Sequence, residues 1–405
     1  MTKTKKTLKF DDAPPTITEA ERHGVYPELG HDERARLNFL MSSYRVLSQR
    51  VAPGNQLTYD QIVEPDFVQA NGRAPANRHE VRKVMNANTF HSLWGSMRRS
   101  LMEIRQMTGQ EVTLRQLESL ANRAAKINAT HENLKLDPSV DIPRYVSEVD
   151  NHCMPGSYFT ERVEGDVAPA ANYDMGLFAT TSGTIGPLND GGGRAMAAWL
   201  KSEHPEFAPK RVLDIGVAVG HSLFGLAQAF PQTQFVAIDI AGPMLRYAAA
   251  RAASCGIKNV QFVQASGEDL SQFEDQSFDV VMSSIFLHEL SGSALPRLLG
   301  QAYQKLAPAG LMIHLEQPQY ADDMPVYEQF IRDWDAYNNN EPFWSAMHEI
   351  DLFDLLGELG FQQENIFQAA LRAPSTAGSS AQTQEFEEHG RAPAWNAYGA
   401  WKAPS

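Results

Sequence analysis

The 405-residue chain has few cysteines, a deficit of positive charge and no long apolar run. Cys153 and Cys255 are too few for a disulfide framework and lack metal-ligand spacing, so we expect reduced thiols and no bound metal. No stretch is long and apolar enough to span a bilayer, and the polar residues 1–10 lack the apolar core of a signal peptide. These absences favour a cytoplasmic protein without a membrane partner.

The charge balance argues against a nucleic-acid partner. Lys and Arg number 35 against 49 Asp and Glu, a net charge of −14, whereas nucleic-acid phosphates reward clustered positive charge. The most basic region, residues 82–126, is interleaved with Glu103, Glu111 and Glu118, which is typical of a solvated helix face. A small-molecule partner is therefore the expectation.

The apolar pattern divides the chain into four parts. Residues 1–31 carry prolines among charges and are expected to form a flexible arm. Residues 32–149 show helical spacing, which predicts a helical domain that forms a homodimer or covers the active site. Residues 150–193 break this pattern and read as a linker or a lid, with 191–193 as the flexible entrance to a helix. Residues 194–405 alternate strands and helices and form the remaining domain.

The stretch Arg-Val-Leu-Asp-Ile-Gly-Val-Ala-Val-Gly, residues 211–220, predicts a buried strand, a tight glycine turn and the start of a helix. Such a turn lets the backbone approach a ligand closely, and the helix N-terminus favours polar or anionic groups. A second strand, 235–239, ends in Asp239, whose carboxylate can accept two ribose hydroxyls. Further strands are predicted over 259–264, 278–283 and 311–315, followed by a closing hairpin over 361–371 and 395–402.

In this order and spacing the segments resemble the class I S-adenosylmethionine-dependent methyltransferases, over residues 186–405. The resemblance implies an α/β fold, a Rossmann-like seven-stranded sheet, with S-adenosylmethionine as cofactor. Ala218 and Ser266 depart from the family's usual Gly and Asp, but alanine fits a tight turn and serine still forms hydrogen bonds. The residues that the resemblance assigns to the cofactor are Asp214, Gly216, Ala218, Gly220, Asp239, Ile240, Met244, Ser266, Gly267, Glu268 and Ser283.

Two later motifs carry the catalytic hypothesis. Phe-Leu-His-Glu-Leu (286–290) and Ile-His-Leu-Glu (313–316) resemble the dimeric small-molecule O-methyltransferases. The resemblance makes His288 the base that deprotonates an acceptor hydroxyl, Glu316 the group that orients it, and Glu349 a second carboxylate. A neutral histidine with a pKa near the working pH suits this step. The alternative is that His288 only caps the following helix.

The acceptor pocket is less well defined by the sequence. Residues 317–347 are rich in aromatic side chains, which line a pocket for a flat substrate or pack a cap helix. We expect methyl transfer from S-adenosylmethionine to a small-molecule hydroxyl. Alternatives are transfer to sulfur, nitrogen or carbon, and a non-catalytic cofactor-binding protein; a nicotinamide dehydrogenase would need Gly-x-Gly-x-x-Gly, which the turn lacks. The candidate acceptor contacts are His152, Tyr158, Trp334 and Trp344.

Overall fold

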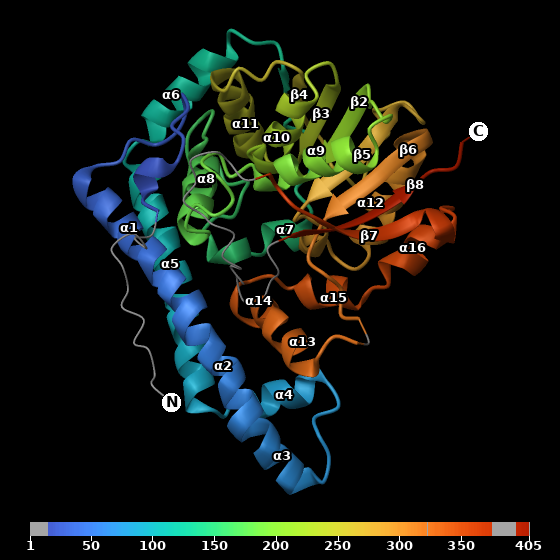
Figure 1. The fold of residues 1–405 in the computed structure, drawn as a ribbon. Helices are drawn as coiled ribbons and strands as arrows, with labels where there is room; N and C mark the ends of the chain where they lie inside the picture. The colour runs from blue at the N-terminus through green and yellow to red at the C-terminus, as the bar shows by residue number, and fades with distance from the viewer. Residues whose placement is uncertain (1–14, 322, 375–393, 405) are drawn as a thin grey trace.

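The computed structural model describes residues 15–321, 323–374 and 394–404, and it is an α/β structure with a helical N-terminal region, as predicted. A sheet is covered by helices on both faces, and long helices of the N-terminal region form a further layer along one side (Figure 1). None of the helices in these three described ranges has the length and apolarity needed to cross a membrane.

The sheet has eight strands, and its order places β2 between β3 and β5. The neighbouring strands from β1 to β6 run parallel, and β8 pairs antiparallel with both β6 and β7, which is the predicted closing hairpin. In spatial order the strands are β1 (Leu134–Lys135), β4 (Val260–Gln264), β3 (Gln234–Asp239), β2 (Arg211–Ile215), β5 (Phe278–Ser284), β6 (Leu306–Leu315), β8 (Trp395–Trp401) and β7 (Ile366–Leu371).

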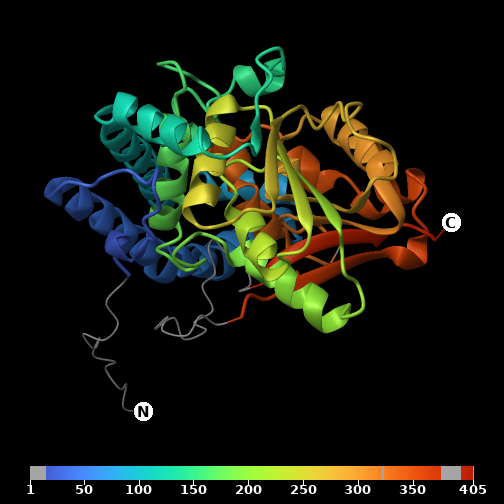
Figure 2. The ribbon, with the colours of Figure 1, turned by 90° about the horizontal axis from the view of Figure 1, so that it is seen from above.

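Both faces of the central strands are buried, which explains why they appear as continuous apolar runs. On one face Val212 and Phe235 pack with α9 (Gly191–Glu203), α10 (His221–Ala229) and α11 (Gly242–Ser254). On the other face Leu213 and Val236 pack with α12 (Ala294–Lys305) and α16 (Leu352–Glu358). Seen from above, α9 and α12 lie on opposite sides of the sheet (Figure 2).

The N-terminal region is helical, as its periodicity predicts, and it has its own apolar core. This core includes Leu37, Trp94 and Leu101, and it is completed by Phe330 and Trp334 from the segment after β6. The helices are α1 (His31–Val46), α2 (Ala52–Thr58), α3 (Glu64–Asn71), α4 (Arg78–Met85), α5 (Thr89–Leu114) and α6 (Leu117–Asn128), with α7 (Arg144–Ser147), α13 (Val326–Arg332), α14 (Trp334–Asn338) and α15 (Trp344–Glu349) between them and the sheet.

Two of the predicted segments differ in structure from what was expected. Residues 1–14 of the predicted arm lie outside the described residues, but Ile17 and Val25 have no exposed surface and belong to the apolar core. The predicted linker contains α8 (Ala168–Thr180), and ten of its 13 residues are buried. Apolar side chains therefore make both segments part of the packed interior. The strand β1 is a further difference, because it lies in the region that was expected to be helical.

Gly191–Gly193 do not form a flexible entrance, because they are buried in the first turn of α9. A Cβ on Gly193 would lie 1.6 Å from the carbonyl oxygen of Ser222 and 3.1 Å from the amide nitrogen of Leu226. The glycine therefore lets α9 approach the backbone of α10. Since α10 follows the glycine turn of the predicted cofactor site, this contact helps to position that turn.

We predict that Gly193→Ala destabilises the protein, because the new methyl group would overlap the Ser222 carbonyl. Overpacking of this kind costs about 1–3 kcal/mol or more. The measurement is urea unfolding, with Gly292→Ala as the matched control, since nothing lies within 4 Å of a Cβ at Gly292. Equal unfolding midpoints for the two variants would contradict the close packing of α9 on α10.

Candidate active site

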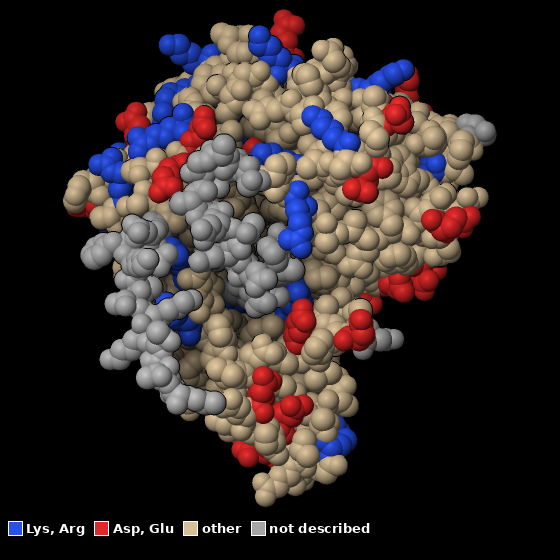
Figure 3. Space-filling model, in the orientation of Figure 1, with Lys and Arg blue, Asp and Glu red and all other residues tan. Residues whose placement is uncertain are grey.

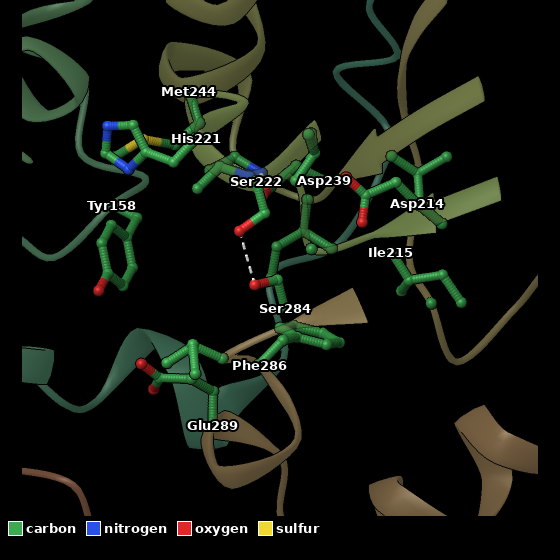
Figure 4. Close-up of a pocket in the computed structure, with 18 of the residues that line it drawn as sticks. Tyr158, Asp214, Ile215, His221, Ser222, Asp239, Met244, Ser284, Phe286 and Glu289 are labelled. Atoms are coloured by element: carbon green, nitrogen blue, oxygen red, sulfur yellow. Dashed lines mark hydrogen bonds between the residues drawn. The ribbon is translucent and has the colours of Figure 1, made fainter. Parts of the chain in front are cut away.

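A cavity of about 290 Å³ lies at the carboxyl ends of β2, β3 and β5. The turns after these strands line the cavity, as do residues of α8 and of the segment before it. Figure 4 shows Tyr158, from that segment, across the cavity from Asp214. Since β2 pairs with β3 on one side and β5 on the other, the connections after the strands diverge here. Open parallel sheets bind ligands at such a position.

Asp239 joins the turns that follow β2 and β3. Its carboxylate accepts hydrogen bonds from the backbone N–H of Ala218 and of Ala241, each at 2.9 Å. Burial raises the pKa of Asp239, although the backbone donors oppose this shift. The carboxylate is thus held in place at the cavity, where it can accept further hydrogen bonds from hydroxyl groups of a ligand.

The turn after β2 has the conformation that its small residues predict. Gly216 has φ +72°, and a Cβ there would lie 2.4 Å from the ring of Phe286. Glycine therefore permits the left-handed backbone and the close approach of Phe286, which also lines the cavity. Ala218 adopts φ +47° and still lines the cavity. Gly220 instead lies behind the cavity wall as the N-cap of α10.

Asp214 lies at the end of β2, buried beside Asp239. Burial, together with the negative charge of Asp239, raises the pKa of Asp214 to about 8. At neutral pH this side chain is therefore mainly a neutral carboxylic acid. A cation bound in the cavity would favour its ionised form.

The opposite end of the predicted cofactor region is formed by the turn after β4. Ser266, Gly267 and Glu268 line the cavity there, as do Ile240 and Met244. The hydroxyl of Tyr145 donates a 2.8 Å hydrogen bond to Glu268. A residue from the segment before the strand domain thus takes part in the wall, which the sequence did not predict.

Ser283 does not face the cavity. It is fully buried, and its hydroxyl lies 2.7 Å from Nδ1 of His314 in the core. The next residue, Ser284, lines the cavity and lies 2.7 Å from the hydroxyl of Ser222. Successive residues of a strand point to opposite faces, so only one of Ser283 and Ser284 can face the cavity. This alternation of side-chain direction along β5 was the sequence signal for choosing between them.

His288 is also absent from the cavity wall, contrary to a direct role as base. It is 1% exposed, and its Nδ1 lies 2.8 Å from Glu316. The Glu316 carboxylate also accepts a 2.8 Å hydrogen bond from the backbone N–H of Leu287, so it holds the turn after β5. The following residue, Glu289, lines the cavity instead.

Glu289 belongs to an alternating cluster of carboxylates and imidazoles. Nε2 of His152 lies 3.3 Å from Glu289, and Nδ1 of the same ring lies 3.0 Å from Glu341. Nε2 of His288 lies 3.6 Å from Glu341 and 3.9 Å from Glu289. Burial opposes protonation, but the carboxylates raise the pKa of His288 to about 9 and that of His152 well above its ordinary value. The neighbouring carboxylates therefore favour the imidazolium form of both rings.

The remaining candidate residues are mostly outside the cavity. Tyr158 lines it, and His152 contacts its wall through Glu289. Glu349 pairs with Arg78 on a half-exposed surface, so it is not at the site. Two tryptophans pack elsewhere: Trp334 against Trp94 in the helical core, and Trp344 against His288, with its indole N–H donated to the Arg332 carbonyl at 2.8 Å.

Several cavity residues were not found from the sequence, some because they come from distant segments and others because a neighbouring residue was chosen in their place. His221 opens α10 directly after the glycine turn, so its position was the available signal, whereas the side chains of α8 had none. The part of the chain that the structure describes contains no group of three or more His, Cys, Asp or Glu arranged to hold a metal. The cavity residues that sequence reasoning missed include Tyr145, Asn151, Tyr173, Asn189, His221, Ser222, Ser284, Phe286 and Glu289.

The segment that forms this cavity matches a known family. A family model described as a methyltransferase domain matches residues 212–310, from β2 into the start of β6. The chain contains a class I S-adenosylmethionine-dependent methyltransferase domain. The resemblance seen in the sequence is thereby confirmed for the superfamily.

Characterised relatives match the methyltransferase domain over part of their length. Demethylmenaquinone methyltransferase of Thermus thermophilus is 34% identical over 28% of this chain and 50% of its own. A tRNA (guanine-N(7)-)-methyltransferase of Chloroflexus aggregans is 33% identical over 25% of this chain and 49% of its own. The chain spans about half the length of these curated relatives. A solved O-methyltransferase family protein from Burkholderia thailandensis is 13% identical, covers 75% of this chain and 73% of its own, and has a TM-score of 0.41.

We predict that the buried contact between His288 and Glu316 makes stability pH-dependent. The pKa of His288 is raised to about 9 in the folded state, so protonation stabilises the fold fully below the ordinary histidine pKa of 6.5. This contribution, about 3 kcal/mol, is lost as the pH rises from 6.5 through 9. Urea unfolding at both ends of this range measures it.

His288→Gln provides the comparison, because glutamine can still donate to Glu316 but does not titrate. The variant is expected to lose less stability than the wild type between pH 6.5 and 9.5. Parallel losses in the two proteins would show that other groups cause the pH dependence.

Proposed function

We propose that this protein transfers a methyl group from S-adenosylmethionine to a small-molecule acceptor. The observation that carries the proposal is the cavity at the end of β2, where Asp239 is held by backbone N–H groups and Asp214 faces the same space. The ligand's sulfonium makes its methyl group electrophilic, and the chain's residues hold the acceptor in line with it. Asp239 binds the ribose hydroxyls, while Ile240 and Met244 pack on the adenine.

The part of the cavity that is lined by α8 and Tyr158 supports a small-molecule substrate. Its walls come from Tyr173, Leu177 and Thr181 of α8 and from Tyr158. Lys and Arg lie among Asp and Glu on the face drawn in Figure 3, and the chain has a net charge of −14. An RNA acceptor, as the name of the Chloroflexus relative indicates for that protein, would require clustered positive charge along a nucleic-acid path.

We place the acceptor hydroxyl next to Glu289. This carboxylate is the part of the imidazole and carboxylate cluster that lines the cavity, and its side chain is 17% exposed. Burial would raise the pKa of Glu289, but His152 and His288 hold it below its ordinary value. Glu289 is therefore ionised and orients the hydroxyl by accepting its hydrogen bond. It receives the proton as the new O–C bond forms, when the oxygen gains positive charge and its proton becomes strongly acidic, while His288 stabilises the charge of Glu289. This replaces direct proton abstraction by His288.

Two alternatives for the same site differ in the accepting atom or in catalysis. Transfer to a thioether sulfur needs no base, so Glu289 would then matter for binding only. A non-catalytic protein would bind the cofactor without methylating any acceptor. The Glu289 carboxylate at the cavity wall favours an acceptor that donates a hydrogen bond to it.

An exposed apolar stripe on α5 supports the proposed homodimer. Ten of the twelve large apolar side chains exposed among the described residues lie between Phe39 and Leu114. Along α5, the members of the stripe are three, four or seven residues apart, which are the spacings of a coiled-coil seam. Its members are Leu93, Met97, Ile104, Met107 and Leu114. A second copy of the chain, related to the first by a twofold axis, would bury this stripe against its own.

Titration calorimetry tests the cofactor. We expect S-adenosylmethionine to bind with micromolar affinity and Asp239→Ala to weaken binding at least tenfold, because the carboxylate that accepts the ribose hydroxyls is removed. NAD and NADP serve as control ligands and should not bind. The absence of S-adenosylmethionine binding to the wild type would exclude the proposed function.

The same titration reports on Asp214. Because its pKa is about 8 without a ligand, it is mostly protonated at pH 7, and a bound cation lowers that pKa. Binding of S-adenosylmethionine at pH 7 is therefore expected to release on the order of one proton, measured from buffers of different ionisation enthalpy. S-adenosylhomocysteine lacks the sulfonium charge and should release less. Asp214→Asn should abolish the difference between the two ligands.

Methyl-transfer assays with a panel of hydroxyl, amine and thioether acceptors test the role of Glu289. For a hydroxyl acceptor, Glu289→Gln should lower kcat about 10²–10⁴-fold, because glutamine cannot accept the proton. S-adenosylmethionine affinity in the same variant is the control and should be retained. Full activity of Glu289→Gln with a hydroxyl acceptor would exclude this carboxylate as the proton acceptor.

The oligomeric state is measured by light scattering after size exclusion. We expect a dimer for the wild type and a monomer for Met107→Glu, since the charge would be buried unpaired in the interface. Leu136→Glu, which changes a 37% exposed side chain outside the stripe, is the matched control and should remain dimeric. A monomeric wild type would contradict the proposal.

A further inference from the structure

A second buried charge cluster adjoins the cavity at His221. At its centre is Asp174 of α8, which is 3% exposed. Its Oδ1 lies 2.7 Å from Nε2 of His221, and its Oδ2 lies 2.9 Å from Nε2 of His23. The hydroxyl of Tyr247 donates to Oδ2 at 2.9 Å, and Nε of Arg251 lies 3.5 Å from that oxygen. Three separate segments thus converge on one carboxylate held by α8.

Two residues connect this cluster to the cavity: Asn189, whose side-chain amide donates to Asp174, and the imidazole of His221. His221 lines the cavity and is 9% exposed, and it opens α10 directly after the glycine turn. His23 and Tyr247, in contrast, are not among the lining residues. In Figure 4, His221 and Asp214 lie on opposite sides of the cavity. A ligand whose ribose is bound by Asp239 near Asp214 would therefore extend its other end toward His221.

The contacts of Asp174 determine which nitrogen of His221 carries a proton. Burial opposes ionisation, but Arg251 and the two histidines hold the pKa of Asp174 well below its ordinary value, so Asp174 is a carboxylate. A carboxylate only accepts, so His221 donates its Nε2–H. Burial lowers the pKa of His221, and the ring is neutral at pH 7. Nδ1 then carries the ring's lone pair, and the residue lines the cavity.

We propose that His221 binds the amino-acid end of S-adenosylmethionine by accepting a hydrogen bond from its ammonium group at Nδ1, with Asp174 as the residue that positions the ring. This inference rests on the proposed function, because it assigns a further contact to the same ligand. The ammonium group is the hydrogen-bond donor at that end of the molecule. Asp174 can orient the ring because the carboxylate is itself fixed by His23, Tyr247 and Arg251.

The cluster also makes the N-terminal region part of the site. His23 precedes α1, and Asp174 belongs to α8, so neither lies in the segment matched by the methyltransferase model. Arg251 donates to the carbonyl oxygen of Val219 at 3.0 Å, in the glycine turn itself. The orientation of His221 and the position of the turn therefore depend on the same buried charges.

The test compares affinities for S-adenosylhomocysteine and for its deaminated analogue, in which hydrogen replaces the amino group. The wild type should bind the analogue at least tenfold more weakly. His221→Phe retains a ring but has no acceptor, so its two affinities should agree within about threefold. A second analogue of S-adenosylhomocysteine, which lacks the carboxylate and keeps the amino group, is the control. The factor by which it binds more weakly than S-adenosylhomocysteine should be the same in the wild type and in His221→Phe. His204→Phe, a change of an imidazole outside the cavity lining, should behave as the wild type.

The positioning role of Asp174 is tested by the same ratio. Asp174→Ala should bind S-adenosylhomocysteine and its deaminated analogue with similar affinities. Asp174→Asn keeps an acceptor oxygen for the His221 N–H, so it should retain most of the preference for S-adenosylhomocysteine. A folding defect alone would lower both affinities together and leave their ratio unchanged. Tenfold discrimination that persists in His221→Phe would overturn the inference while the proposed function stands. A wild type that binds neither S-adenosylmethionine nor S-adenosylhomocysteine would overturn both.

Discussion

The carboxylate of Glu316 is the contact on which the cavity wall depends. It follows β6, yet it accepts hydrogen bonds from the backbone after β5 and lies 2.8 Å from Nδ1 of His288. A single buried anion thus holds the ends of β5 and β6 together and sets the course of the turn that follows β5. The position of Phe286 against Gly216 and the exposure of Glu289 to the cavity both follow from that turn.

The helical N-terminal region completes the site that the sheet begins. The turns after β2, β3 and β4 provide the proposed cofactor contacts, whereas Tyr173 and Leu177 of α8 and Tyr145 close the space above them. The apolar core that joins α1 and α5 to Phe330 and Trp334 holds these layers together. Substitutions in the N-terminal core should therefore alter the shape of the cavity through α8, which packs against both the N-terminal helices and the strand domain.

The residues proposed for the cofactor largely line the cavity, and this was predictable because they follow strands within one continuous segment. Asp214, Ala218 and Asp239 each line the cavity as expected. The acceptor side was predicted poorly. Trp334 and Glu349 were placed in the pocket from residue type and resemblance, but long-range packing puts one in the helical core and the other beside Arg78. Aromatic composition alone did not indicate whether a side chain faces a core or a cavity.

The sequence by itself determined the order of strands and turns, because alternating apolar runs and glycine turns are local signals. It also identified Asp239 at the end of β3, and this residue lines the cavity. Only the tertiary structure decided that His288 is enclosed while Glu289 faces the cavity, and that α8 is a buried wall and not a linker. The physical reason is that burial and the pairing of charges depend on segments far apart in the chain, such as Asp174 with His23 and His221.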